Sequence, residues 1–217
     1  MAMKTANIFH GLYQFTDVLE PIKLSMHLYL LQAEESVLIQ TGAVPHTQAA
    51  LPEIKKLLDG KQLKYILISH FESDECGGIS LVLKEFPEAI PVCSETTARQ
   101  LWGFGLAQRI EIKKAGEHLV GKDFDFTTIA YPSEMHLWEG LLFIETKRGI
   151  LFSSDLMFRM GETHAQIIES SWADAVKTSG SDQLPDPEMQ KKMTDDLKAL
   201  APVFIASGHG PCIKIIG

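Results

Sequence analysis

The sequence ISHFESDECGG, residues 68–78, places five candidate metal ligands within eleven positions: His70, Glu72, Asp74, Glu75 and Cys76. This stretch begins at the last residue of the apolar run LKYILI, residues 63–68, whose composition favours a buried strand. A glycine pair follows at once and allows the backbone to turn tightly. Acids and a histidine at the end of a buried strand are typical of a site at the edge of an α/β sheet, so this stretch indicates a metal site.

The composition is that of an ordinary globular protein. The chain has 217 residues, 45% hydrophobic and 22% charged, which predicts one domain over residues 1–217. The net charge of −8 argues against nucleic acid and anionic membrane surfaces, because both need a basic face. The N-terminus lacks a signal-peptide pattern and no apolar stretch approaches about 18 residues, so we expect no membrane association. Three cysteines give no disulfide framework or four-cysteine iron site and predict a reducing, cytoplasmic location.

Strand and helix patterns follow one another in each half of the chain. In the first half, strands are expected at 27–33, 36–42, 63–70 and 89–95, and helices at 46–60, 77–87 and 95–105. In the second half, strands are expected at 109–115, 124–132, 141–149, 150–158 and 202–211, and helices at 163–177 and 187–201. Two sheets packed together with helices outside would satisfy this order, so we predict an α/β protein with a four-layer αββα sandwich.

The acidic stretch has the spacing to serve two metal ions. His70, Glu72 and Asp74 are two residues apart, and in an extended segment such side chains point the same way. Glu75 breaks this spacing and sits where the next helix is expected to begin. The strand end could therefore offer His70 and Glu72 to one metal, and Asp74 and Glu75 to another.

Further ligands are expected at the ends of other strands. His136 follows the strand predicted at 124–132, Asp155 ends the apolar run ILFSS, and His209 stands between two glycines after the last predicted strand. Taken singly, a histidine or aspartate at a strand end is more often structural or exposed. Together, and in this order, the positions predict a site assembled from several strands along one edge.

The ordered set resembles the metal-binding motifs of the metallo-β-lactamase superfamily, over essentially the whole chain. Glu72 at the second motif position, with the stretches MHLWEGLLF and ILFSSDLMF, resembles the flavodiiron-like branch, including its stand-alone oxygen-binding diiron proteins. The resemblance implies the four-layer fold and the diiron module without a flavodoxin domain. Gln40 departs from the aspartate usual before Thr-Gly in the superfamily.

The resemblance also implies how the ligands divide between two iron ions. His70, Glu72 and His136 would hold the first iron, Asp74 and His209 the second, and Asp155 would bridge them, as in an Fe–O–Fe type centre. Glu75 stands where this branch usually has a histidine, and would bind the second iron either directly or through water.

The chemistry of this set favours iron. Three imidazoles with up to four carboxylates and no thiolate suit iron or manganese, whereas zinc sites draw more on histidine and cysteine. Zinc and manganese remain the alternative metals, since zinc binds borderline sites tightly. Four carboxylates would also balance the charge of two divalent ions.

The leading hypothesis is a diiron protein that binds O2 or NO and reduces it when a separate flavodoxin- or rubredoxin-type donor supplies electrons. One alternative is a dinuclear zinc or manganese hydrolase. Glu72 argues against it, because the hydrolytic branches of the superfamily mostly have histidine at this position. Another is an O2 or NO sensor that acts through a partner. The resemblance further implies a homodimer.

Overall fold

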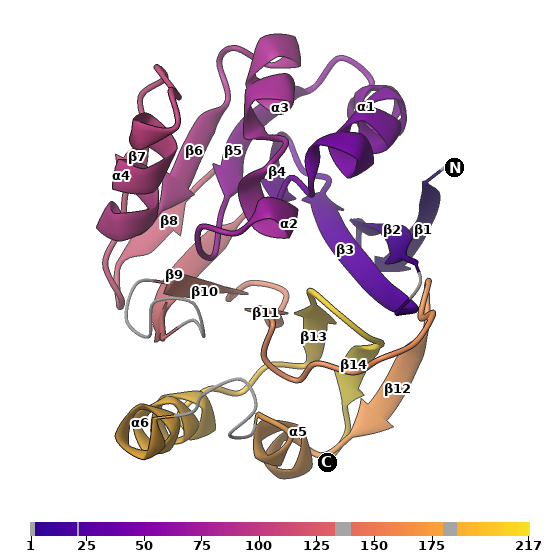
Figure 1. The fold of residues 1–217 in the computed structure, drawn as a ribbon. Coiled ribbons are helices and arrows are strands. Elements are labelled where there is room, and N and C mark those ends of the chain that lie inside the picture. The colour runs from indigo at the N-terminus through magenta and orange to yellow at the C-terminus, as the bar shows by residue number, and fades with distance from the viewer. Residues whose placement is uncertain (1–2, 21, 133–139, 180–185) are drawn as a thin grey trace.

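The computed structural model describes residues 3–20, 22–132, 140–179 and 186–217. These residues form two seven-stranded sheets, with helices outside each (Figure 1). The first sheet, in the order β1-β2-β3-β4-β5-β6-β7, consists of Lys4–Phe9, Leu12–Leu19, Leu24–Leu31, Glu35–Ile39, Gln62–Leu67, Ile90–Cys93 and Glu111–Ile112.

The second sheet comes from the other half of the chain, in the order β12-β14-β13-β11-β10-β9-β8. From β8 to β14 its strands are His118–Val120, Asp125–Tyr131, Gly140–Glu145, Ile150–Ser154, Ile167–Ser170, Phe204–Ser207 and Cys212–Ile215. Helices α1 to α4 are Val44–Leu58, Ser73–Cys76, Ile79–Glu85 and Glu95–Gly103, and helices α5 and α6 are Trp172–Lys177 and Pro187–Lys198.

Strand residues pack alternately into different layers because successive side chains point to opposite faces of a sheet. In β4, Leu38 packs against helices α1 and α3, while Val37 and Ile39 belong to the cluster between the two sheets. In β10, Phe143 faces the same central cluster and Ile144 packs in the layer that contains α5 and α6. Three apolar layers therefore separate four structural layers, and the predicted αββα sandwich is confirmed.

Three segments differ from the sequence expectations. The helix expected over 163–177 is instead strand β12 followed by the shorter helix α5. Strand β12 pairs in parallel with β14. The sequence predicts 202–211 as the last strand, and β14 is a further strand that follows it. The hairpin of β1 and β2 was not predicted either. Strand β12 is held by a partner more than forty residues away, which local sequence patterns do not reveal.

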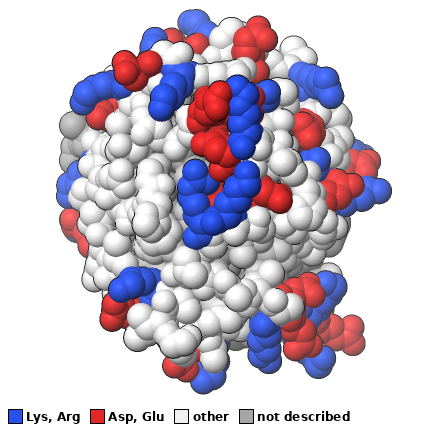
Figure 2. Space-filling view, turned by 180° about the vertical axis from the view of Figure 1, so that it is seen from behind, with Lys and Arg blue, Asp and Glu red and all other residues white. Residues whose placement is uncertain are grey.

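The topology brings several strand ends to one edge. Strand β5 lies in parallel between β4 and β6 and ends at Leu67, while β11 and β13 are parallel neighbours that end at Ser154 and Ser207. The loops after these strands carry the predicted ligands. None of the helices that the structure describes is long and apolar enough to cross a membrane. On the face shown in Figure 2, Lys and Arg side chains stand beside Asp and Glu, and much of the surface is uncharged.

Candidate metal centre

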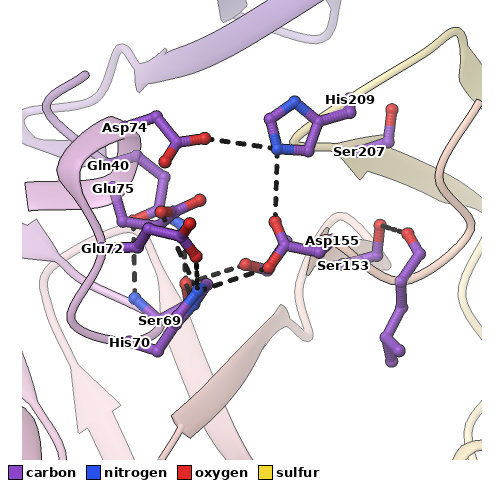
Figure 3. Close-up of polar contacts among 12 residues, drawn as sticks. Gln40, Ser69, His70, Glu72, Asp74, Glu75, Ser153, Asp155, Ser207 and His209 are labelled. Carbon is purple, nitrogen blue, oxygen red and sulfur yellow. Dashed lines mark hydrogen bonds and ion pairs between the residues drawn. The ribbon is translucent and has the colours of Figure 1, made fainter. Parts of the chain in front are cut away.

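The acidic stretch does not stay extended. Glu72 has extended backbone angles and precedes the short helix α2, so Asp74 and Glu75 lie on a helical turn. The prediction that His70, Glu72 and Asp74 point the same way along an extended segment is therefore wrong for Asp74. Acidic side chains in a first helical turn are favoured by the helix dipole, and the turn brings both Asp74 and Glu75 towards the strand ends of the second sheet (Figure 3).

Asp155 lies at the centre of the site and contacts a histidine on each side. Its Oδ2 is 3.3 Å from Nε2 of His70, and its Oδ1 is 3.3 Å from Nε2 of His209 (Figure 3). Asp74 Oδ2 approaches the same His209 nitrogen at 3.3 Å. One carboxylate thus joins two histidines that come from different sheets.

The two other acids of the stretch differ in burial. Glu72 Oε2 is 3.1 Å from His70 Nε2, and its side chain is 35% exposed, which places it at the rim. Glu75 is 3% exposed and belongs to two compact groups of ligand atoms, one with His70 and Asp155 and one with Asp74 and His209. Within each group all ligand atoms lie within 4.8 Å of one another.

The hydroxyl of Ser69 orients the ring of His70. The Oγ of Ser69 is 3.0 Å from His70 Nδ1, receives a hydrogen bond of 2.8 Å from the Gln40 amide, and lies 2.8 Å from the Ser154 hydroxyl. A hydroxyl has one proton and two lone pairs. If it accepts from Gln40 and from a protonated Nδ1, it donates to Ser154, and His70 Nε2 keeps its lone pair for a ligand.

His209 is oriented by a backbone carbonyl of β3. A carbonyl oxygen only accepts hydrogen bonds, so the contact of 3.0 Å between His209 Nδ1 and Ser25 O requires the proton on Nδ1. Nε2 is then free to face Asp74 and Asp155. The neighbouring His27 is buried, with its backbone N–H on Gly208 O at 3.0 Å and its ring Nε2 on Gly210 O at 2.9 Å. His27 therefore supports the loop rather than lining the site.

Sequence reasoning missed several of these residues. Tyr131 ends β9 and its hydroxyl donates to Asp155 Oδ2 at 3.1 Å. No motif in the sequence points to Ser69 or Ser154, and Gln40 stands out only as a departure from the superfamily. The one usable signal was position, since Ser69 and Ser154 each precede a predicted ligand. His136, predicted to bind the first metal, lies outside the described residues.

Charges in the site shift several pKa values. Burial opposes charge on His209, but its contacts with Asp155 and Asp74 outweigh this and raise its pKa to about 10. Burial likewise opposes charge on His70, and the hydrogen bond with Glu72 and the charge of Asp155 still raise its pKa. Burial, followed by the charges of Asp155 and Asp74, raises the pKa of Glu75 well above its usual value. The cluster therefore holds protons that a cation would displace.

The donor set fits a pair of divalent cations. Glu75 Oε2 and Asp155 Oδ1 are buried and form no hydrogen bond with any part of the described chain. Buried carboxylate oxygens normally have hydrogen-bond partners, so two such atoms beside the ring nitrogens of His70 and His209 fit a position for a bound cation. Oxygen-rich sites with imidazole suit iron or manganese better than zinc.

Comparison with known proteins identifies the family of this chain. A family model described as the ODP family beta lactamase matches residues 24–210. The chain belongs to this family. The resemblance to the flavodiiron branch of the metallo-β-lactamase superfamily is thereby confirmed.

Relatives of this ODP family member include a putative diflavin flavoprotein from Nostoc sp., 26% identical over 197 residues, which cover 85% of this chain and 33% of that protein. An anaerobic nitric oxide reductase flavorubredoxin from Vibrio vulnificus is 24% identical over 134 residues, 60% of this chain and 27% of that protein. The chain thus spans about a third of the length of these relatives.

Solved structures show the same fold. The metal-soaked flavodiiron core of a Synechocystis protein superposes with a TM-score of 0.81 at 19% identity, covering 98% of this chain and 57% of that one. The rubredoxin oxygen:oxidoreductase of Desulfovibrio gigas gives a TM-score of 0.81 at 17% identity, covering 97% of this chain and 57% of that one.

Proposed function

We propose that the chain holds two iron ions at this site and binds O2 or NO there. When bound, two ferrous ions supply a pair of adjacent sites for a diatomic gas and the electrons to begin its reduction. A separate electron donor of flavodoxin or rubredoxin type would sustain turnover. The relatives' names, a flavorubredoxin and a rubredoxin oxygen:oxidoreductase, support this reading.

The observation that carries the proposal is the position of Asp155. Its two oxygens face two histidine nitrogens at 3.3 Å each, which is the arrangement a bridging carboxylate needs. His70 and Glu72 would hold one ion, with His136 if the resemblance extends to it, and Asp74 and His209 would hold the other. Glu75 lies within reach of both.

The surrounding residues prepare the ligands. Ser69 and the Ser25 carbonyl direct the Nε2 atoms of both histidines inward. The hydroxyl of Tyr131 donates to Asp155 and so fixes the orientation of the shared carboxylate. Such supporting hydrogen bonds commonly raise metal affinity by about 10- to 100-fold.

The experiment is metal analysis followed by gas binding. Protein produced with ample iron should contain about two iron ions per chain, and its ferrous form should change absorbance within the mixing time of a stopped-flow instrument when O2 or NO is added. Asp155→Ala is the control that should lose both responses. Iron-free protein from iron-rich cells, or a ferrous form that ignores both gases, would overturn the proposal. Chelator-sensitive hydrolysis of generic esters or phosphodiesters, with no gas response, would favour the hydrolase instead.

A further inference from the structure

Glu75, like Asp155, reaches both halves of the site. Its Oε2 lies 3.9 Å from His70 Nε2, and its ligand atoms fall within 4.8 Å of Asp155 in one group and of Asp74 and His209 in the other. The side chain is 3% exposed, and Oε2 forms no hydrogen bond within the described chain. A carboxylate oxygen buried in this way is aimed at a position that a cation would occupy.

The backbone holds Glu75 in this position. The Thr41 N–H donates to Glu75 O at 2.7 Å, and the Thr41 hydroxyl donates to the same oxygen at 3.2 Å. Just beyond, Gly78 N donates to Gly42 O at 2.9 Å, and a Cβ at Gly78 would lie 1.6 Å from the Thr47 hydroxyl. Helix α2 is thus tied closely to the turn after β4, which fixes the backbone of Glu75 beside the site.

We propose that Glu75 is a ligand shared by both metal ions, so that the site has two bridging carboxylates, Glu75 and Asp155. This inference rests on the proposed dinuclear site and specifies its coordination. One ion then has His70 and Glu72 as its own ligands, and the other has His209 and Asp74. Both ions share the carboxylates of Glu75 and Asp155.

This assignment balances both ligands and charge. The two halves become equivalent in their described ligands, and four carboxylates neutralise two divalent ions. A set with two imidazoles and four carboxylates is rich in oxygen and favours Fe²⁺ or Mn²⁺ over softer metals. A histidine at position 75 would supply a single donor atom to a single ion and could not bridge.

Titration of the metal-free protein with Mn²⁺, followed by metal analysis and electron paramagnetic resonance, tests the inference without any activity assay. The unmodified protein should bind about two Mn²⁺ ions per chain and give the signal of a coupled pair. Glu75→Gln keeps the shape and removes the charge. It should lower the affinity for both ions by about tenfold or more and reduce the coupling signal, because Asp155 would be the one bridge left. Glu72→Gln removes a carboxylate that serves one ion, and should weaken only that ion.

Two further variants keep the test decisive. Glu75→Asp retains a carboxylate and should bind two ions more tightly than Glu75→Gln, whereas Glu75→His should hold a pair bridged by Asp155 alone and so show weaker coupling than the unmodified protein. Circular dichroism should show that metal-free Glu75→Gln melts no lower than the unmodified protein, because glutamine keeps the shape of the side chain and adds no charge to the buried cluster.

The outcomes separate the two proposals. Two ions and an unchanged coupled signal in Glu75→Gln would overturn the shared role of Glu75 and leave the dinuclear site standing. Failure of the unmodified protein to bind either Mn²⁺ or Fe²⁺ would overturn both. Equal losses in Glu75→Asp and Glu75→Gln would show that the carboxylate itself is not the ligand.

Discussion

Ser69→Ala removes the hydroxyl that connects three polar groups beside the candidate metal site. Ser69 is 3% exposed, and its Oγ contacts the Gln40 amide at 2.8 Å, His70 Nδ1 at 3.0 Å and the Ser154 hydroxyl at 2.8 Å. Alanine fills nearly the same space, so the backbone should be retained. The Gln40 and His70 donors would then lack their acceptor, and the Ser154 hydroxyl would lose the partner that donates to it.

The size of the effect follows from these lost partners. A buried donor without an acceptor costs about 1–3 kcal/mol, and two such donors are created. Partial relief by rotation of the Gln40 amide leaves a loss of about 3 kcal/mol in the free energy of unfolding. For a chain of this length, that corresponds to a melting temperature lower by about 6–12 °C. Because Nδ1 would no longer fix the ring of His70, metal affinity should also fall by about 10- to 100-fold.

The assay compares two buried serines. Ser36 is fully buried, and its hydroxyl bonds with the backbone of Ala33 at 3.2 and 3.3 Å, away from the site. Melting of the metal-free proteins by circular dichroism, with competitive titration by Fe²⁺ or Co²⁺, should show both variants destabilised but only Ser69→Ala impaired in metal binding. The reasoning fails if Ser69→Ala and Ser36→Ala bind metal with equal affinity.

Three other predictions concern the same site. Asp155→Ala should lose both metal ions, because its carboxylate is shared between them, whereas His209→Ala should lower mainly the affinity for the second ion. Metal content measured by plasma spectrometry tests this, and equal content in Asp155→Ala and the unmodified protein would contradict it. Tyr131→Phe leaves Asp155 Oδ2 without its 3.1 Å donor and should lower stability in urea unfolding by about 1–3 kcal/mol; unchanged unfolding would show that the bond contributes nothing. The pKa of His209, raised to about 10, means that metal must displace a proton, so affinity should rise by up to about tenfold per pH unit between about pH 7 and pH 9. In the metal-free protein, the protonated imidazole of His209 stabilises the fold. This stabilisation is fully present below pH about 6.5 and is lost as pH rises through about 10, so the melting temperature of the metal-free protein should fall over that range.

The layered fold was predictable because strands carry apolar residues on both faces. Val37, Leu38 and Ile39 are all buried, so both sides of the sheet must be covered, and helical patterns between the strands supply the outer layers. The pairing of β12 with β14 was not predictable, because Ile167 and Ile168 meet residues more than forty positions away. Such non-local pairing depends on topology, and a short run such as QIIES is compatible with either strand or helix.

The meeting of four candidate ligands was predictable, and the local shape of the site was less so. His70, Asp74, Asp155 and His209 converge as the strand-end argument required. The turn at α2 could have been predicted from two acids in a first helical turn followed by glycines. The orientation of the histidines could not, because it depends on contacts such as Ser25 O with His209, made across 184 positions of sequence.

The position of the site between the two halves connects metal binding to stability. His70, Asp74 and Glu75 come from the half that forms the first sheet, whereas Asp155 and His209 directly follow strands β11 and β13 of the second (Figure 3). Without cations, closing the sandwich brings several carboxylates together in a buried space, which opposes folding. The three apolar layers must offset that cost. Any ion that binds only the folded arrangement then stabilises the protein by mass action, so metal content and melting temperature should rise together. The acids that make the metal-free fold less stable are thus the same ones that would select and retain a divalent pair.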